Sequence, residues 1–197
     1  MKIFAFSDLH HSRQRAEALV RNSEGADLVI GAGDFCNMRS GLPGAMSLLK
    51  DIQRPFVAVP GNAESIEELR DAAHAETTVL HGESVTLSGL TVLGIGYGIP
   101  QTPFGEWSCD LGEDEAAELL SPFDHADILV THSPPFGIAD VTSQGKSVGS
   151  TAILAAIDRI KPKLVLCGHI HDSWGQEGTV GSSRIVNLGP DGMWFQI

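Results

Sequence analysis

The chain has 197 residues, of which 42% are hydrophobic and 19% charged, and it carries a formal net charge of −12 with a pI of about 4.9. This length suits a single domain over residues 1–197 that buries roughly 70% of the surface of its unfolded chain. The acidity argues against strong binding to nucleic acid or to anionic membranes. No apolar run approaches the ~18 residues that a membrane span needs. The three cysteines share no zinc-type spacing, which favours a reducing, cytoplasmic setting.

The first third of the chain alternates between strand and helix patterns. Short apolar runs predict strands over residues 2–6, 27–30 and 56–59. Each is followed by a helical pattern, and the helix starts are marked by Ser12 as an N-cap, by Pro43 in a first turn, and by a capping box at Ser65. Repeated strand–loop–helix units predict a parallel sheet with right-handed crossovers.

The middle of the chain changes character. Three short β-type runs, at residues 77–80, 84–87 and 90–94, indicate an antiparallel section or a second sheet. Two long loops follow, one over residues 95–112 and one running from about residue 135 to 149, and loops of this length are usually functional. They carry Tyr97, Phe104, Trp107 and Phe136. These aromatic side chains either form a wall on which a nucleobase stacks or pack the loops down.

The last part of the chain returns to alternating elements. Helices are predicted around residues 113–120 and over the stretch that carries Ile153, Ile157 and Ile160, and strands at 128–130 and 164–166. The tail predicts three more strands, near residues 176–180, 183–188 and 193–196. No repeat or linker interrupts this pattern, so we expect one α/β domain.

Potential metal ligands follow the predicted strands, at the points where the strands end. Ligand-bearing loops of open α/β sheets gather at the carboxyl edge of the strands, so these side chains should lie close together. Two carboxylates, four imidazoles and one amide are too many ligands for one tetrahedral ion, and they suit two divalent ions that share a carboxylate. The residues are Asp8, His10, Asp34, Asn62, His132, His169 and His171.

The order and spacing of these residues resemble the calcineurin-like metallophosphoesterase superfamily, in particular its small prokaryotic members related to cyclic-nucleotide phosphodiesterases. The motifs that carry the resemblance are Asp8-x-His10, Gly33-Asp34-x-x-Asn37, Gly61-Asn62, His132 and Gly168-His169-x-His171. The resemblance implies a four-layer α/β/β/α sandwich with two mixed β-sheets.

The resemblance also implies a ligand assignment, in which Asp34 bridges the two ions. One ion would take Asp8, His10 and His171, and the other Asn62, His132 and His169, so that Asn62 and His132 are also counted as catalytic. The metals usual in the family are Mn, Fe, Zn or Ni, with manganese as our first expectation. The implied reaction is hydrolysis of small phosphoesters or nucleotides by a metal-bridging hydroxide, with a phosphodiesterase favoured over a phosphomonoesterase.

The sequence departs from the family at one catalytic position. Many members continue Gly-Asn with a histidine that protonates the leaving group, whereas this chain has Ala63 followed by Glu64. His11 is the nearest candidate donor and substrate-binding residue, and its alternative role is that of a solvent-facing loop histidine. Asn37 is expected to contact the substrate phosphate or to hold Asp34. Glu64 is interpreted as a first-turn acid that interacts with the helix dipole.

Two other functions share these residues. A nuclease would use the same metal centre, but the low pI and the absence of a Lys/Arg run disfavour it. A non-catalytic interaction scaffold on the same fold is disfavoured because the full ligand set is present. The sequence leaves the physiological substrate, the native metal and the oligomeric state open.

Overall fold

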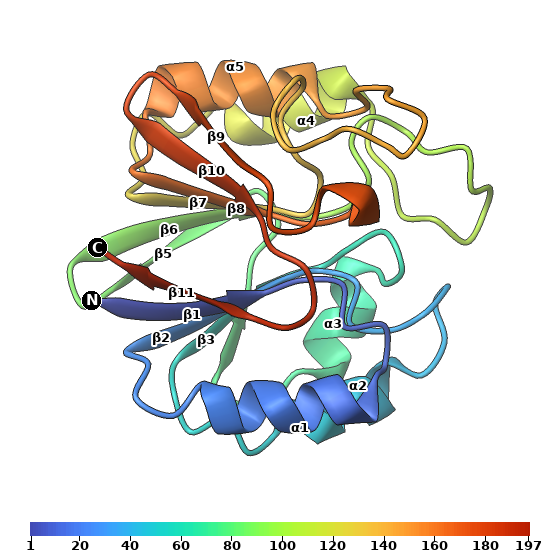
Figure 1. The fold of residues 1–197 in the computed structure, drawn as a ribbon, viewed down its shortest axis with the longest axis vertical. Helices are drawn as coiled ribbons and strands as arrows, with labels where there is room; N and C mark the ends of the chain where they lie inside the picture. Colours follow the sequence, from blue (N-terminus) through green and yellow to red (C-terminus); the bar gives the residue numbers. More distant parts are fainter.

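The computed structural model describes residues 1–197 as two β-sheets packed face to face between two layers of helices (Figure 1). The α/β/β/α sandwich with mixed sheets is therefore confirmed. No helix is at once long enough and apolar enough to span a bilayer.

The first sheet has five strands in the order β11-β1-β2-β3-β4. β1 to β4 are parallel, while β11 runs antiparallel to β1 along the opposite edge. The strands span β1 (Lys2–Phe6), β2 (Leu28–Ala32), β3 (Phe56–Val59), β4 (Thr77–Val79) and β11 (Met193–Gln196).

The second sheet has six strands in the order β5-β6-β7-β8-β10-β9. Its four inner strands are parallel, and the edge strands β5 and β9 are antiparallel to their neighbours. The strands span β5 (Glu83–Leu87), β6 (Leu90–Ile95), β7 (Ile128–Thr131), β8 (Leu164–Cys167), β9 (Glu177–Val180) and β10 (Ser183–Asn187). The predicted middle section is thus divided, because β4 extends the first sheet and the β5–β6 hairpin begins the second.

Five α-helices cover the outer faces of the two sheets (Figure 1). Against the first sheet lie α1 (Arg13–Asn22), α2 (Leu42–Leu49) and α3 (Ile66–Ala72), and against the second lie α4 (Glu113–Leu120) and α5 (Thr151–Ile160). The predicted caps are present: Ser12 accepts a hydrogen bond from the backbone of α1, and the Ser65 capping box opens α3. A short 3-10 helix, η1 (His171–Ser173), follows β8.

Side chains alternate between the layers along each strand. In β1, Phe4 and Phe6 belong to the hydrophobic cluster under the helices, whereas Ile3 and Ala5 belong to the cluster between the sheets. A third cluster lies between the second sheet and its helices. Because both faces of each central strand are buried, polar ligands are excluded from the strands and occur in the segments that follow them.

Candidate metal centre

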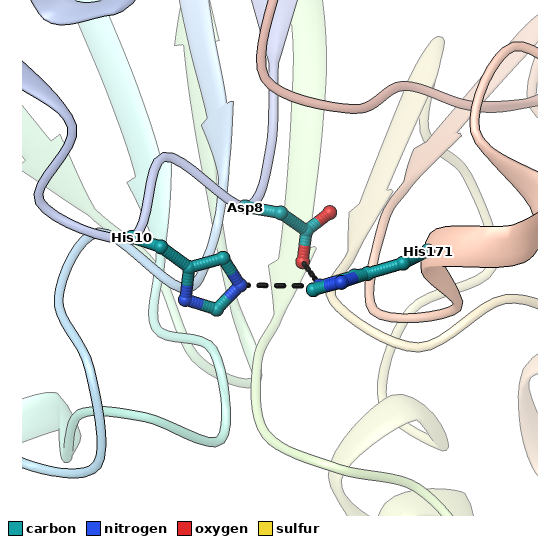
Figure 2. A group of neighbouring side chains, drawn as sticks. All are labelled: Asp8, His10 and His171. Carbon is teal, nitrogen blue, oxygen red and sulfur yellow. Dashed lines mark hydrogen bonds and ion pairs between the residues drawn. The ribbon is translucent and has the colours of Figure 1, made fainter.

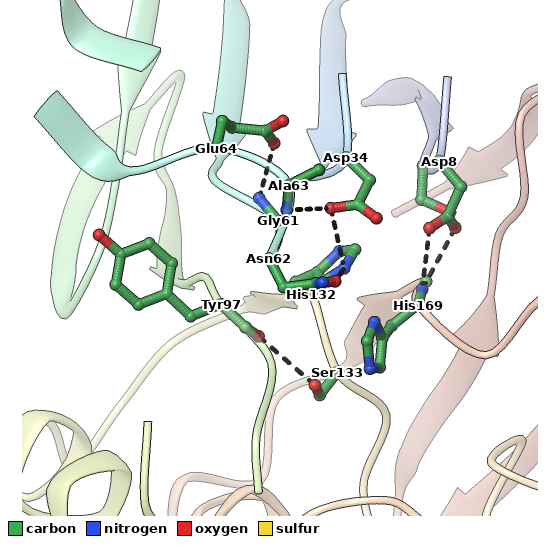
Figure 3. A network of polar contacts seen from close by, with 12 residues as sticks. Asp8, Asp34, Gly61, Asn62, Ala63, Glu64, Tyr97, His132, Ser133 and His169 are labelled. Atoms are coloured by element: carbon green, nitrogen blue, oxygen red, sulfur yellow. Dashed lines mark hydrogen bonds and ion pairs between the residues drawn. The ribbon is translucent and has the colours of Figure 1, made fainter. Parts of the chain in front are cut away.

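All seven predicted ligands lie on one side of the sandwich, where the carboxyl ends of strands from both sheets meet (Figures 2 and 3). The first sheet contributes residues after β1, β2 and β3, and the second contributes residues after β7 and β8. The structure therefore brings together the edges of two sheets, which face each other across the interface between the sheets.

Asp8, His10 and His171 form one group (Figure 2). Nε2 of His10 lies 3.1 Å from Nε2 of His171, which in turn lies 3.6 Å from Oδ1 of Asp8. Nδ1 of His10 lies 3.2 Å from the carbonyl oxygen of Cys36, so this nitrogen carries the proton and donates it. Nε2 of His10 therefore presents a lone pair toward its neighbour.

His132, Asn62 and Asp34 form the adjoining part of the site (Figure 3). Nδ1 of the fully buried His132 donates to the carbonyl oxygen of Ala32 at 2.8 Å, which leaves a lone pair on Nε2. That Nε2 lies 3.2 Å from Oδ1 of Asn62 and 3.4 Å from Oδ1 of Asp34. Nδ2 of Asn62 donates to Ser108 at 3.0 Å, which fixes the amide with its oxygen toward His132.

Asp34 lies between the two groups. Its Oδ2 is 3.7 Å from Nε2 of His10, and its Oδ1 is 3.4 Å from Nε2 of His132 and accepts the backbone N–H of Ala63 at 2.9 Å. A Cβ at Gly61 would lie 2.0 Å from Oδ1, so the loop after β3 can approach this carboxylate only with glycine at that position.

His169 extends the set on the side of the second sheet. Its ring centroid lies 4.9 Å from that of His132, and its backbone N–H donates to both carboxylate oxygens of Asp8 at 3.2 Å. Asp8, Asp34 and His169 all have left-handed backbone conformations, with φ of 53°, 56° and 66°. Such conformations cost of order 1–3 kcal/mol each in residues other than glycine and are concentrated at functional sites.

The arrangement of donors fits divalent cations. Nε2 of His132, whose proton is on Nδ1, faces two oxygen acceptors, so lone pairs converge at this point. Converging acceptors of this kind are repulsive unless a cation lies among them. A mixed set of imidazole, carboxylate and amide donors suits first-row transition metals.

The pKa shifts of the groups in this site also fit a bound cation. Burial and the nearby charge of Asp8 raise the pKa of Asp34 to about 7. Burial opposes ionisation of Asp8 as well, but the hydrogen bond with His171, the proximity of His132 and the Ser7 hydroxyl lower its pKa below the ordinary value. Removal from water lowers the pKa of His169 to about 3, so its imidazole is neutral at pH 7 and free to bind metal.

Glu64 is a site residue that the sequence interpretation missed. It is fully buried and precedes α3, which begins at Ile66, so the first-turn interpretation is wrong. Its carboxylate accepts backbone N–H groups from Gly61 at 2.8 Å and from Phe35 and Cys36 at 3.3 Å each. Glu64 thereby ties the loop that carries Asn62 to the loop after β2. Burial and the charge of Asp34 raise its pKa to about 7.

Trp174 is a second missed residue. Its Nε1–H donates to Oδ2 of Asp8 at 3.1 Å, and its ring packs on that of His171 with centroids 4.3 Å apart. The Ser7 hydroxyl donates to the same Oδ2 at 2.5 Å. The only sequence signal for this role is the presence of tryptophan three residues after His171, which carries no specific meaning before the loop is folded.

The remaining candidates lie at the margin of the site. His11 is exposed and lies against the start of α2, where a Cβ at Gly41 or Gly44 would come within 2.7 or 2.9 Å of its ring. Asn37 donates to the carbonyl oxygen of His10 at 3.0 Å and has no bond to Asp34, so the expectation that it holds Asp34 directly is not met. Ala63 is 2% exposed and belongs to the hydrophobic cluster under the helices.

The class to which this fold belongs follows from a match to a family model. The chain belongs to the calcineurin-like phosphoesterase family, whose sequence model matches residues 1–173. Metallophosphoesterase domain-containing protein 1 of Homo sapiens is 32% identical over 135 residues, which are 65% of this chain and 38% of that protein. UPF0046 protein T07D4.2 of Caenorhabditis elegans is 29% identical over 133 residues, which are 64% of this chain and 31% of that protein. The chain thus spans about a third of the length of these relatives.

Solved structures share the fold at low sequence identity. Protein TT1561 of Thermus thermophilus superposes with a TM-score of 0.77 at 21% identity, covering 95% of this chain and 88% of that one. A dimetal phosphatase from Danio rerio superposes with a TM-score of 0.64 at 11% identity, covering 96% and 87%. These likenesses support the two-sheet sandwich.

Proposed function

We propose that this protein hydrolyses small phosphoesters at a centre of two divalent metal ions, with phosphodiesters preferred to phosphomonoesters. The observation that carries the proposal is the position of Asp34 between two imidazoles that belong to different groups of ligands. Its Oδ2 lies 3.7 Å from Nε2 of His10 and its Oδ1 lies 3.4 Å from Nε2 of His132. One carboxylate in that position can serve two ions at once.

The proposed division of ligands gives each ion three residues besides the shared Asp34. When bound, the ions supply Lewis acidity, which lowers the pKa of a water nucleophile and offsets charge on the phosphoryl oxygens. Mn, Fe, Zn and Ni all suit these donors. The two sets are Asp8, His10 and His171 for one ion, and Asn62, His132 and His169 for the other.

Groups that form hydrogen bonds with the ligands hold them in the orientation that metal binding needs. The carbonyl oxygens of Cys36 and Ala32 select the tautomers of His10 and His132 that leave Nε2 free. Asp34 and His132 lie at the buried end, whereas the side chain of His171 is 49% exposed. Substrate would therefore approach from the side of His171.

The setting that we propose is the cytoplasm, with a small nucleotide or other phosphoester as substrate. All three cysteines are unpaired, which supports a reducing compartment. The net charge of −12 supports a small substrate over a nucleic acid, because a polyanion would be repelled by the rest of the surface.

The test is a panel of metals against substrates. The protein is loaded with Mn, Zn, Fe or Ni and assayed on cyclic nucleotides, phosphomonoesters and aryl phosphodiesters, with Asp34→Asn as the inactive control. We expect turnover with at least one metal and faster turnover of diesters. Competition by single-stranded DNA at low salt would instead favour a nuclease. Metal binding without turnover of any ester would favour a non-catalytic scaffold.

A further inference from the structure

The loop between β6 and α4 carries an aromatic side chain to the edge of the metal centre. The ring centroid of Phe104 lies 6.4 Å from that of His169, and the two rings are inclined at 69°. Phe104 is nevertheless 49% exposed. This phenyl ring therefore contacts a candidate metal ligand while keeping much of its surface open to solvent.

Trp107 supports the phenyl ring by stacking on one of its faces. The two rings are stacked at a centroid distance of 5.6 Å and an interplanar angle of 11°. Trp107 itself packs against the hydrophobic cluster under the first sheet's helices, so it anchors the loop. The aromatic residues thus divide into a partly buried support, Trp107, and an exposed ring, Phe104.

The same loop is tied to a candidate metal ligand. Ser108 accepts a hydrogen bond from Nδ2 of Asn62 at 3.0 Å, and the backbone N–H of Cys109 donates to the Asn62 carbonyl oxygen at 2.9 Å. Ser108 also donates to Asp110, whose other oxygen accepts from Thr102. These bonds brace the loop on both sides of Phe104, so the ring is held at a fixed place relative to the ligands.

The other long-loop aromatics do not share this position. The hydroxyl of Tyr97 accepts the backbone N–H of Ile66, and its ring packs on His81 at 4.3 Å, so Tyr97 is an anchor. Phe136 is 46% exposed on the second long loop and forms no aromatic pair with any of the candidate ligands. Phe136 is therefore a matched control for Phe104.

On the basis of the proposed hydrolysis, we infer that Phe104, backed by Trp107, is the binding face for a planar aromatic ring of the substrate. Stacked or inclined aromatic pairs have centroids 4.5–7 Å apart, so a ring on the open face of Phe104 stays beside His169 and within reach of an ester bond at the metals. The shared chemistry is a flat π-system, which either an aryl ester or a nucleobase supplies.

The inference is tested by binding to the metal-loaded protein, measured by calorimetry. The ligands are phenylphosphonate, a nucleoside 5′-phosphonate and methylphosphonate, of which the last has no ring. Aromatic stacking predicts that Phe104→Ala weakens binding of a ring-bearing ligand by at least about fivefold. Methylphosphonate binding should stay within twofold, and Phe136→Ala should change none of the three. A loss with phenylphosphonate identifies any aryl ring as the occupant, and a loss confined to the nucleoside ligand identifies a nucleobase.

Equal losses for all three ligands, the same losses in Phe136→Ala, or unchanged binding in Phe104→Ala would each overturn the inference. The melting temperature of each variant shows whether a loss comes from unfolding. Binding that depends on Phe104, in a protein that hydrolyses no ester, would remove the proposed hydrolysis and leave the aromatic binding face in place. Aryl esters and fluoroalkyl esters with the same leaving-group pKa can also be compared as substrates. Equal rates of hydrolysis for the two, in the native protein and in Phe104→Ala, would remove the aromatic binding face and leave the proposed hydrolysis in place.

Discussion

The indole Nε1–H of Trp174 donates a hydrogen bond of 3.1 Å to Oδ2 of Asp8, while the indole ring lies against His171. One side chain thus orients two of the three candidate ligands of one ion. The bond engages Oδ2 and leaves Oδ1, which is 3.6 Å from His171, directed toward the group of ligands.

Trp174→Phe keeps an aromatic ring and removes the hydrogen bond to Asp8. Loss of a partner behind a metal ligand typically lowers metal affinity about 10- to 100-fold, and we expect a loss in that range. Calorimetric titration of metal-free protein with Mn²⁺ measures it. Trp194→Phe is the control, because Trp194 is 47% exposed on β11 and packs on Phe4. Equal affinities in both variants would show that the indole bond does not position Asp8.

Glu64→Gln should loosen the connection between two ligand loops. Both oxygens of Glu64 accept hydrogen bonds, and glutamine has only one acceptor, so at least one buried N–H from Gly61, Phe35 or Cys36 loses its partner. Leaving such a group unsatisfied costs about 1–3 kcal/mol. Urea denaturation of metal-free protein should show this decrease, and Glu67→Gln, at an exposed position of α3, should not. A Glu64→Gln variant as stable as the native protein would contradict the role.

The stability of the metal-free protein should fall as the pH rises from about 4.5 to 7. Burial raises the pKa of Glu64 from 4.5 to about 7 and that of Asp34 from 3.8 to about 7, so each carboxyl binds more protons in the folded protein than in the unfolded chain. His169 acts in the opposite direction because its pKa is lowered to about 3, but this single group offsets only one of the two carboxyls. The stabilisation from these two carboxyls is fully present below their pKa values in the unfolded chain. It is lost as the pH rises through their pKa values in the folded protein. Glu64→Gln should make the slope shallower. A rise in stability over this interval would show that other groups dominate.

Asp34→Asn should lose both ions, since a bridging ligand serves each. The native protein should approach two equivalents of metal on elemental analysis after reconstitution. Asp124→Asn, at an exposed position away from the site, should retain them. Full metal content in the Asp34 variant would exclude the bridging assignment.

The leaving group should control the rate strongly. A positioned general acid typically contributes ~10²–10⁴-fold for a poor leaving group, and Ala63 cannot donate a proton. Aryl esters should therefore react much faster than alkyl esters, with a steep dependence on leaving-group pKa. His11→Ala and the exposed control His125→Ala should leave this dependence unchanged. A shallow native dependence that steepens only in His11→Ala would identify His11 as the donor.

Much of the fold and the ligand set could be predicted from the chain in order. Short apolar runs and caps such as Ser12 and Ser65 are local signals, and they placed the helices and strands to within a few residues. The partition of strands between two sheets could not be predicted from local pattern. β4 and β5 look alike in sequence, yet one pairs with β3 and the other with β6. Likewise β11 crosses back to pair with β1, a contact between the two ends of the chain.

By itself, the sequence determined which residues are the candidate metal ligands, because Asp8, Asp34 and His132 each follow a strand and chain order fixes that relation. Tertiary structure alone decided which side chains support and surround them. Glu64, Trp174 and Phe104 have ordinary neighbours in sequence, and their roles come from segments that meet only after the two sheets pack. Metal ligands carry a recognisable donor chemistry, whereas a supporting hydrogen bond or a stacked ring is defined by distance, which only the folded chain provides.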